Sequence, residues 1–162
     1  MLDRDGTLNK RIPDNYLLKE KDILWPADFK DLLKIVNSGI KISVVSNQAC
    51  VSKKIISYSD VISITKSVIS PLFEIDDKSI FICIHQEIEN CFCRKPKPGL
   101  ILKSLEYFKI SSGNAVFIGD SEKDAEAAKA ANVRFIGVCW DSKCLGQKCV
   151  HSLSSAVDVI FS

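Results

Sequence analysis

Short runs rich in β-branched residues alternate with helical patterns along this chain, and this alternation limits the possible fold more than any other feature. The runs have the character of buried strands, and they span residues 40–45, 80–84, 115–118 and 134–138. Strands that alternate with helices form a parallel sheet with helices on both of its faces. The sequence therefore predicts a doubly wound α/β fold with a parallel sheet.

Four segments between these runs have the pattern of amphipathic helices, at residues 28–37, 59–73, 98–108 and 122–131. The third begins with Pro98, which suits a helix start, whereas Pro71 and several β-branched residues weaken the second. A chain of 162 residues fits one domain, 1–162. A loop and one helix fill the interval between Asp3 and Ser46, so we expect no cap domain there.

Composition and charge exclude several classes of protein. Apolar residues make up 46% of the chain and charged residues 26%, as in folded globular proteins. A net charge of +2 is too small for a dedicated nucleic-acid binder. No apolar run reaches the roughly 18 residues of a membrane span, and Asp3, Arg4 and Asp5 stand where a signal peptide needs apolar residues. We expect a cytoplasmic protein without nucleic-acid or membrane partners.

Polar residues gather where the strands end, which is where ligands bind in parallel sheets. Asp3 and Asp5 lie two residues apart in an extended stretch, so both side chains project to the same side. Their oxygens suit a hard cation such as Mg²⁺, and a carboxylate beside such a cation can attack phosphorus. A surface turn is the alternative, whereas a calcium loop is excluded because no glutamate closes it.

Three further motifs carry groups that bind phosphate or metal. The hydroxyl of Ser46 and the amide of Asn47 follow a strand and can donate hydrogen bonds to phosphate oxygens. Arg94 and Lys95 bring positive charge to the start of a helix, and Asp120 follows another strand. Singly, these motifs also fit a capped turn, a solvated basic loop and a helix cap. Together and in this order they indicate phosphoryl transfer.

The order of these motifs resembles that of the haloacid dehalogenase-like phosphatases. The matching stretches are 3–8 (Asp-Arg-Asp-Gly-Thr-Leu), 46–48 (Ser-Asn-Gln), 94–99 (Arg-Lys-Pro-Lys-Pro-Gly) and 119–124 (Gly-Asp-Ser-x-x-Asp). The resemblance extends from residue 1 to about residue 140 and is closest to the branch with heptose-bisphosphate and histidinol-phosphate phosphatases. It implies a capless, Rossmann-like sheet and hydrolysis of a small phosphorylated metabolite through an aspartyl-phosphate.

The resemblance also implies roles for the residues at the strand ends. Asp3 is expected to be the nucleophile and Asp5 the general acid and base. Ser46, with Asn47, would hold the transferring phosphoryl group, and Lys95 would stabilise its charge. These roles agree with the chemistry, because phosphoryl transfer depends mostly on positioning and on neutralising charge.

A magnesium site follows from the same resemblance. It would consist of the Asp3 carboxylate, the backbone carbonyl of Asp5 and the carboxylate of Asp120. Asp124 would support this metal loop without touching the ion, and Arg94 would contact the substrate.

Cysteine spacing predicts a second metal site. Seven cysteines, an odd number, point to thiols or metal ligation before a disulfide framework. Cys83, His85, Cys91 and Cys93 offer three thiolates and one imidazole, a set suited to tetrahedral zinc. The same branch of the family carries a zinc loop of this form directly before its Arg-Lys pair, which implies structural zinc here. Buried, reduced thiols beside a surface histidine are the alternative.

The other cysteines look like ordinary reduced thiols, and they are Cys50, Cys139, Cys144 and Cys149. A second zinc site from Cys144, Cys149 and His151 lacks a clear fourth ligand, so we do not expect one.

Short loops must set the specificity of an uncapped site. Asn15 and Tyr16 occupy the place from which family members contact substrate, and the expected contact set is Asn15, Tyr16, Asn47, Gln48 and Arg94. The Arg-Lys motif looks closer to the heptose-bisphosphate enzymes. It favours removal of the 7-phosphate of D-glycero-D-manno-heptose 1,7-bisphosphate, with histidinol phosphate as the alternative substrate.

A catalytically inactive, zinc-stabilised binding module is the alternative from another class. The presence of Asp3, Asp5, Lys95 and Asp120 argues against it, because an inactive relative would be free to lose at least one of them. We therefore expect an enzyme whose partner is a small phosphorylated sugar or histidinol phosphate, and which is a monomer.

Two features depart from the family pattern. Only Met1 and Leu2 precede the first aspartate, whereas a central strand normally needs about five residues to reach the active-site edge. Either the true start lies upstream or the first strand is very short. Residues 48–54 also lack the glycine-arginine pattern common in relatives, and Lys53 or Lys54 is expected to supply that charge.

Overall fold

The structure is a computed structural model that describes residues 1–12, 15–139 and 149–162. Its strands are β1 (Val44–Asn47), β2 (Ile80–Cys83), β3 (Val116–Gly119), β4 (Arg134–Val138) and β5 (Cys149–Val150). Its α-helices are α1 (Leu33–Asn37), α2 (Tyr58–Ile69), α3 (Gly99–Phe108), α4 (Glu122–Ala130) and α5 (Leu153–Phe161). Short 3₁₀ turns lie at Glu20–Asp22, Phe29–Leu32, Asp77–Ser79, Glu87–Glu89 and Ser112–Asn114.

The strands are parallel, and Leu2 joins them into one sheet. β1 pairs with β2, with Val44 opposite Ile80, and β3 pairs with β4, which in turn pairs with β5. Leu2 forms parallel bridges to Val44 on one side and to Ile118 on the other. The order across the sheet is therefore β2, β1, Leu2, β3, β4, β5. This confirms the predicted parallel sheet, with a first strand reduced to the surroundings of one residue.

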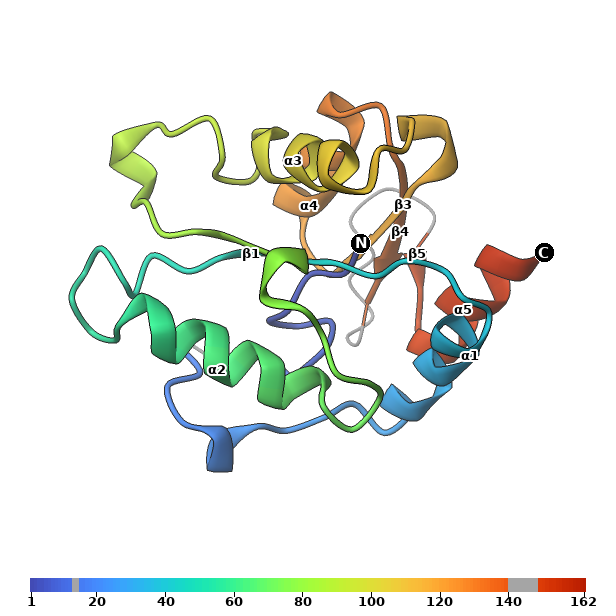
Figure 1. Ribbon diagram of the computed structural model, residues 1–162, viewed down its shortest axis with the longest axis horizontal. Coiled ribbons are helices and arrows are strands. Elements are labelled where there is room, and N and C mark those ends of the chain that lie inside the picture. Colours follow the sequence, from blue (N-terminus) through green and yellow to red (C-terminus); the bar gives the residue numbers. More distant parts are fainter. Residues whose placement is uncertain (13–14, 140–148) are drawn as a thin grey trace.

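Helices cover both faces of the sheet (Figure 1). α3 and α4 lie on one face, and α1, α2 and α5 lie on the other. Successive strand residues point to opposite faces, so Val44 packs in the core beside α2 and α5 while Val45 packs in the core beneath α3 and α4. The doubly wound architecture predicted from the alternation is confirmed.

Element boundaries differ from the predicted ones for local reasons. β1 begins at Val44 and not at residue 40, because its pairing with Leu2 and β2 begins there. α2 starts after the cap residue Ser57, whose hydroxyl accepts the Asp60 N–H, and it ends at Ile69, before Pro71, rather than at residue 73. α5 and β5 were not predicted. No helix in the described parts of the chain is long and apolar enough to cross a bilayer.

The cysteines outside the predicted zinc loop differ in state. Cys50 and Cys139 are free and buried, as expected. Cys149 is disulfide-bonded, so the prediction of a reduced thiol there is wrong. Spacing along the chain does not show which thiols approach each other after folding, and this pairing had no sequence signal. Cys144 lies outside the described residues.

Candidate active site

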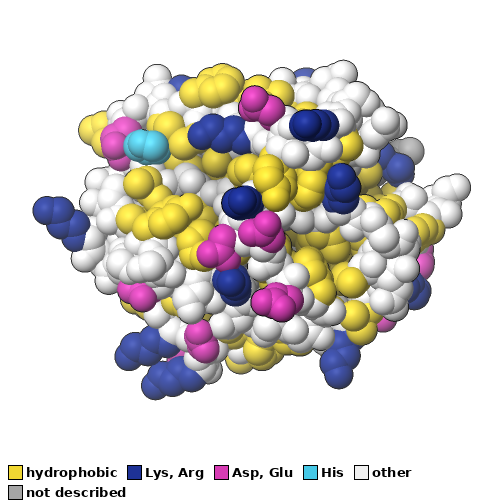
Figure 2. Space-filling view, viewed as in Figure 1, with side chains coloured by type: hydrophobic (Ala, Val, Ile, Leu, Met, Phe, Trp, Pro, Cys, Tyr) yellow, Lys and Arg dark blue, Asp and Glu magenta, His cyan; other side chains and the backbone are white. Residues whose placement is uncertain are grey.

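A cavity of about 630 Å³ opens at the carboxyl ends of the strands. Eight of its lining residues come from the predicted motifs, namely Asp3, Asp5, Ser46, Asn47, Arg94, Lys95, Ser121 and Asp124. The molecular face in Figure 2 carries acidic and basic side chains gathered near its centre among hydrophobic ones. The topology thus brings together residues from distant parts of the sequence at the edge where parallel sheets bind ligands.

Lys95 links two carboxylates in the wall of this cavity. Its Nζ donates to Oδ1 of Asp3 at 2.6 Å and to the carbonyl of Val45 at 3.0 Å, and it forms an ion pair with Oδ1 of Asp124 at 2.6 Å. The Phe117 ring lies 5.4 Å from the same nitrogen. Only 4% of the Lys95 side chain is exposed, so this positive charge is fixed in place.

Burial and charge act against each other on this pair. Burial raises the pKa of Asp3 to about 8, because its cost outweighs the nearby Lys95 and because Asp124 and Asp120 add negative charge. Burial alone would lower the pKa of Lys95, but Asp124 and Asp3 raise it above its usual value. The lysine is therefore charged, while the ionised form of Asp3 needs further positive charge nearby.

Asp5 lies beside Asp3 but has different neighbours. Its carboxylate accepts hydrogen bonds from Arg4, Asn9 and Gln48. Burial alone would raise the pKa of Asp5, but the charge and hydrogen bonds of Arg4, with those of Gln48 and Asn9, lower it below its usual value. Two neighbouring aspartates thus have pKa values shifted in opposite directions, so that without a bound cation and substrate Asp3 favours its protonated form and Asp5 its ionised form.

The residues at the carboxyl end of β1 and directly after it differ in where their side chains point. Ser46 lines the cavity, and its Oγ accepts a hydrogen bond from Nε2 of Gln48 at 2.9 Å. Asn47 exchanges two hydrogen bonds with the backbone of Lys95, at 3.0 and 3.1 Å. Gln48, expected to contact substrate, is fully buried and reaches Oδ2 of Asp5 at 2.6 Å instead of lining the cavity.

Three carboxylates form a group that fits a hard cation. Ligand atoms of Asp3, Asp120 and Asp124 all lie within 4.8 Å of one another. Gly6, at φ +96°, makes room for this group, because a Cβ there would lie 1.8 Å from Oδ2 of Asp120. Burial raises the pKa of Asp120, with Asp124 adding to the effect and Arg11 opposing it. The oxygen donors and the space that Gly6 leaves fit Mg²⁺, whose positive charge would balance the negative charge of the carboxylates.

Ser121 and Asp124 also fix the start of α4. The Ser121 side chain accepts the Asp124 N–H, and Oδ2 of Asp124 accepts the Ser121 N–H at 3.1 Å. This capping box orients Asp124 so that its other oxygen faces Lys95. A helix cap, which the sequence left as an alternative to a functional role, is compatible with that role here.

The rim of the cavity is basic. Asn15 and Tyr16 line it, and the Tyr16 hydroxyl accepts a hydrogen bond from Nζ of Lys53 at 3.0 Å. Arg94 also lines it and donates to the carbonyl of His85 at 3.0 Å. Lys53 thus stands where a basic residue was expected.

Sequence reasoning missed four residues of this site, Arg4, Asn9, Arg11 and Lys123. Arg4 had a signal, because it lies between the two motif aspartates, and Asn9 lies four residues after Asp5. Arg11 had none, since its partner Asp120 is 109 residues away. Asp14, which lies in the same loop as Asn15, falls outside the described residues.

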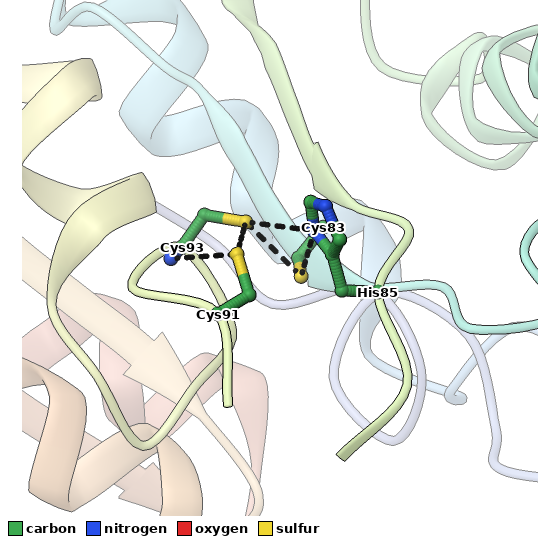
Figure 3. Close-up of side chains that lie close together, drawn as sticks. All are labelled: Cys83, His85, Cys91 and Cys93. Carbon is green, nitrogen blue, oxygen red and sulfur yellow. Dashed lines mark hydrogen bonds between the residues drawn. The ribbon is translucent and has the colours of Figure 1, made fainter. Parts of the chain in front are cut away.

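The four predicted zinc ligands converge at the end of β2 (Figure 3). Sγ of Cys93 lies 2.8 Å from Sγ of Cys91, 3.2 Å from Sγ of Cys83 and 3.4 Å from Nδ1 of His85. Burial, together with Cys91 and Cys83, raises the pKa of Cys93. Three sulfurs and one nitrogen crowded around a common centre form a donor set that suits tetrahedral zinc.

Another cavity, of about 270 Å³, lies at the opposite ends of the strands and is lined mostly by apolar side chains. None of the predicted catalytic or metal-binding residues lines it. The convergence of charged groups, rather than the presence of a hollow, therefore identifies the candidate active site.

Comparison with known proteins agrees with this geometry. A family model described as haloacid dehalogenase-like hydrolase matches residues 18–138. The D-glycero-beta-D-manno-heptose-1,7-bisphosphate 7-phosphatase of Helicobacter pylori is 33% identical over 137 residues, covering 82% of this chain and 78% of that protein. The D-glycero-alpha-D-manno-heptose-1,7-bisphosphate 7-phosphatase of Photorhabdus laumondii is 30% identical over 142 residues, which cover 82% of this chain and 76% of that protein.

Solved structures agree on the fold. A D,D-heptose 1,7-bisphosphate phosphatase from B. bronchiseptica, crystallised with magnesium and phosphate, superposes with a TM-score of 0.85. The match covers 99% of this chain and 96% of that one at 18% sequence identity. At that identity the likeness speaks for a shared architecture, whereas the sequence relatives speak for the family.

Proposed function

Because this chain belongs to the haloacid dehalogenase-like hydrolases, we propose that it is a Mg²⁺-dependent phosphatase that acts through an aspartyl-phosphate. The observation that carries this proposal is the pairing of Asp3 with Lys95, whose carboxylate oxygen and ammonium nitrogen lie 2.6 Å apart in the cavity wall. A nucleophile next to fixed positive charge is what phosphoryl transfer requires.

The two aspartates divide the chemistry between them. In the first step an Oδ atom of Asp3 bonds to phosphorus while the bond from phosphorus to the substrate oxygen breaks, and Asp5 gives its proton to that oxygen. In the second step Asp5 takes a proton from water, the water oxygen bonds to phosphorus, and the bond to Asp3 breaks. Inorganic phosphate leaves, and both carboxyl groups return to their starting state.

The phosphoryl group is held by residues at the carboxyl end of β1 and by the lysine of the Arg-Lys motif. Ser46 presents its hydroxyl to the cavity, and Lys95 supplies the charge. Asn47 holds the backbone of Lys95 through two hydrogen bonds, so we assign it a positioning role in addition to substrate contact. Gln48 contacts both Ser46 and Asp5, and it orients them from behind the site.

The magnesium ligands that we propose are the carboxylates of Asp3 and Asp120 and the backbone carbonyl of Asp5. Their oxygen donors suit a hard cation, and Asp124 supports them through its ion pair with Lys95. A Mg²⁺ ion held by these ligands would supply positive charge to the phosphoryl oxygens.

Zinc has a structural role in this proposal. Cys83, His85, Cys91 and Cys93 would fill all four tetrahedral positions and leave none for substrate. The loop that they close leads directly into Arg94, which hydrogen-bonds to the carbonyl of His85. Zinc would therefore fix the path of the chain into the phosphate-binding motif.

The substrate that we propose is D-glycero-D-manno-heptose 1,7-bisphosphate, hydrolysed at its 7-phosphate. The names of the sequence relatives support this choice. The basic rim supports it independently, because Lys53 and Arg94 add positive charge beyond that of Lys95, whereas Lys123 is paired with Glu87 at 3.0 Å. Histidinol phosphate carries a single phosphate and makes less use of this rim.

The test is phosphate release from both anomers of the heptose bisphosphate and from histidinol phosphate, measured with Mg²⁺ and with EDTA. We expect magnesium-dependent release from the bisphosphate, at a kcat/KM at least about tenfold above that for histidinol phosphate, which corresponds to roughly 1.4 kcal/mol. A preference for histidinol phosphate would overturn the substrate assignment. No release from any of these substrates, by protein shown to bind Mg²⁺, would favour the inactive binding module.

A further inference from the structure

Arg11 lies on the oxygens that we assign to magnesium. Its Nη2 donates to Oδ1 and Oδ2 of Asp120 at 3.0 and 2.9 Å, and to the backbone carbonyl of Asp5 at 3.3 Å. These two residues supply two of the three proposed magnesium ligands. One guanidinium nitrogen therefore reaches the same carboxylate and the same carbonyl that the metal would need.

The two cations compete for one place. Mg²⁺ binds oxygen at about 2.1 Å and demands near-octahedral geometry, so it needs direct access to each ligand. A nitrogen that contacts oxygens of both Asp120 and Asp5 lies between them and blocks that access. The guanidinium must withdraw before a metal ion can bridge these oxygens.

Arg11 is placed so that it can withdraw. Its side chain is 58% exposed, in contrast to Lys95 at 4%, and it lies at the cavity of about 630 Å³. Lys53, Arg94 and Lys123 line the same cavity. A guanidinium released from Asp120 joins these basic groups, and its planar fork suits bidentate contact with phosphate.

We propose that Arg11 is an exchangeable cation with two partners. It neutralises Asp120 when no metal is bound, and it binds the second phosphate of a bisphosphate substrate once Mg²⁺ has displaced it. This rests on the proposed function, because it needs the magnesium site and a substrate with two phosphates. Metal binding and recognition of the far phosphate are then coupled through one side chain. Without Mg²⁺, Arg11 stays on Asp120 and is not free to bind the second phosphate.

The first experiment measures Mg²⁺ binding by isothermal titration calorimetry of the full chain with MgCl₂ alone. It compares the wild type with Arg11→Gln and with Lys10→Gln, which removes a neighbouring exposed positive charge from the same loop. We expect Arg11→Gln to bind Mg²⁺ about two- to fivefold more tightly than Lys10→Gln does, since an ion pair of this exposure opposes binding by that much. Equal or weaker binding by Arg11→Gln would overturn the proposal.

The second experiment tests the phosphate contact. Arg11→Gln should raise KM for the heptose 1,7-bisphosphate about tenfold and leave KM for p-nitrophenyl phosphate, which has one phosphate, within about twofold. Equal effects on both substrates would overturn the proposal. The calorimetric comparison needs no turnover, so a wild-type protein that binds Mg²⁺ but hydrolyses nothing would refute the proposed function while the metal exchange was still measured.

Discussion

Arg4 is completely buried, and its guanidinium forms a bidentate ion pair with the carboxylate of the next residue in the chain, Asp5. Nε donates to Oδ1 at 3.1 Å and Nη2 donates to Oδ2 at 2.8 Å, while Nη1 reaches the Thr65 hydroxyl at 3.3 Å. Gln48 accepts from the same guanidinium at 2.9 Å. The proposed acid and base is thus attached to the core of the protein beneath α2 rather than to a mobile loop.

Replacing Arg4 with lysine tests this attachment. The shorter point charge cannot make the bidentate contact, so we expect the pKa of Asp5 to rise and the free energy of unfolding to fall by about 1–3 kcal/mol. Carboxyl ¹³C NMR titration measures the pKa, and denaturant unfolding measures the stability. Arg134→Lys, at an exposed arginine, is the control. An unchanged titration of Asp5 would show that Arg4 does not set its charge.

Asp3→Asn should lower phosphatase turnover at least about a thousandfold, because an amide cannot act as the nucleophile. Zinc content, measured by atomic emission, should be the same as in the wild type, since Asp3 is not among the clustered thiol and imidazole ligands. Asp22→Asn, at an exposed aspartate, should retain normal turnover. Appreciable turnover by Asp3→Asn would remove this residue from the nucleophile role.

The raised pKa of Asp3 makes Mg²⁺ binding depend on pH. The ordinary pKa of an aspartate is 3.8, and that of Asp3 in the folded protein is about 8. At a pH between these two values the folded protein holds a proton on Asp3, and this proton must leave when a cation binds. We expect the apparent Mg²⁺ affinity to rise by up to about tenfold per pH unit between pH 6 and 8, with proton release. Calorimetry in buffers of different ionisation enthalpy counts the protons. An affinity independent of pH would contradict the shift.

The same carboxyl gives the metal-free protein an opposite trend in stability. The folded state binds more protons than the unfolded state over this window, so stability is highest below pH 3.8 with respect to this group and falls as pH rises toward about 8. The slope is at most about 1.4 kcal/mol per pH unit. Urea unfolding at pH 5.5 and 7.5 checks the sign, in buffer without Mg²⁺ and without a chelator that would remove zinc from the cysteine cluster. Metal-free protein that gains stability across this range would contradict the expectation.

Cys91→Ser should lose zinc and lower the melting temperature by at least about 4 °C, because the loop between β2 and α3 loses the ion that closes it. Cys139→Ala removes a free, buried thiol outside the cluster and should retain full zinc content. Full zinc content in Cys91→Ser, with unchanged melting, would show that Cys91 is not a ligand.

The parts of this fold that could be predicted depend on local patterns. The strands of the central sheet are recognisable as apolar runs in the sequence. Because ligands bind at the carboxyl ends of parallel strands, Asp3, Ser46 and Asp120 could be predicted to lie together. α5 could have been predicted as well, since Ser152 caps a segment with apolar residues at Leu153, Ala156 and Val157. β5 could not, because it has two residues and depends on pairing with β4.

The parts that could not be predicted concern the direction of side chains. Gln48 lies just after β1, two residues beyond Ser46, yet its side chain turns inward because Arg4 and Asp5 offer it hydrogen-bond partners. Arg11 reaches Asp120 only because the first loop folds across the end of β3. Such contacts depend on tertiary packing. The single-domain organisation, the monomeric state and the cytoplasmic location stay predictions.

The narrow join at Leu2 has a mechanical consequence. Leu2 makes two backbone hydrogen bonds toward β1, to Ser43 and from Val45, whereas the adjoining Asp3 N–H bonds to Ile118 in β3. Asp3 is therefore held to β3 through its backbone N–H and to β1 through Lys95, whose Nζ bonds to both Asp3 and the carbonyl of Val45. The nucleophile and the phosphate-binding residues of β1 are thus cross-linked twice, by the backbone of Leu2 and by one buried side chain, and their alignment depends on both links.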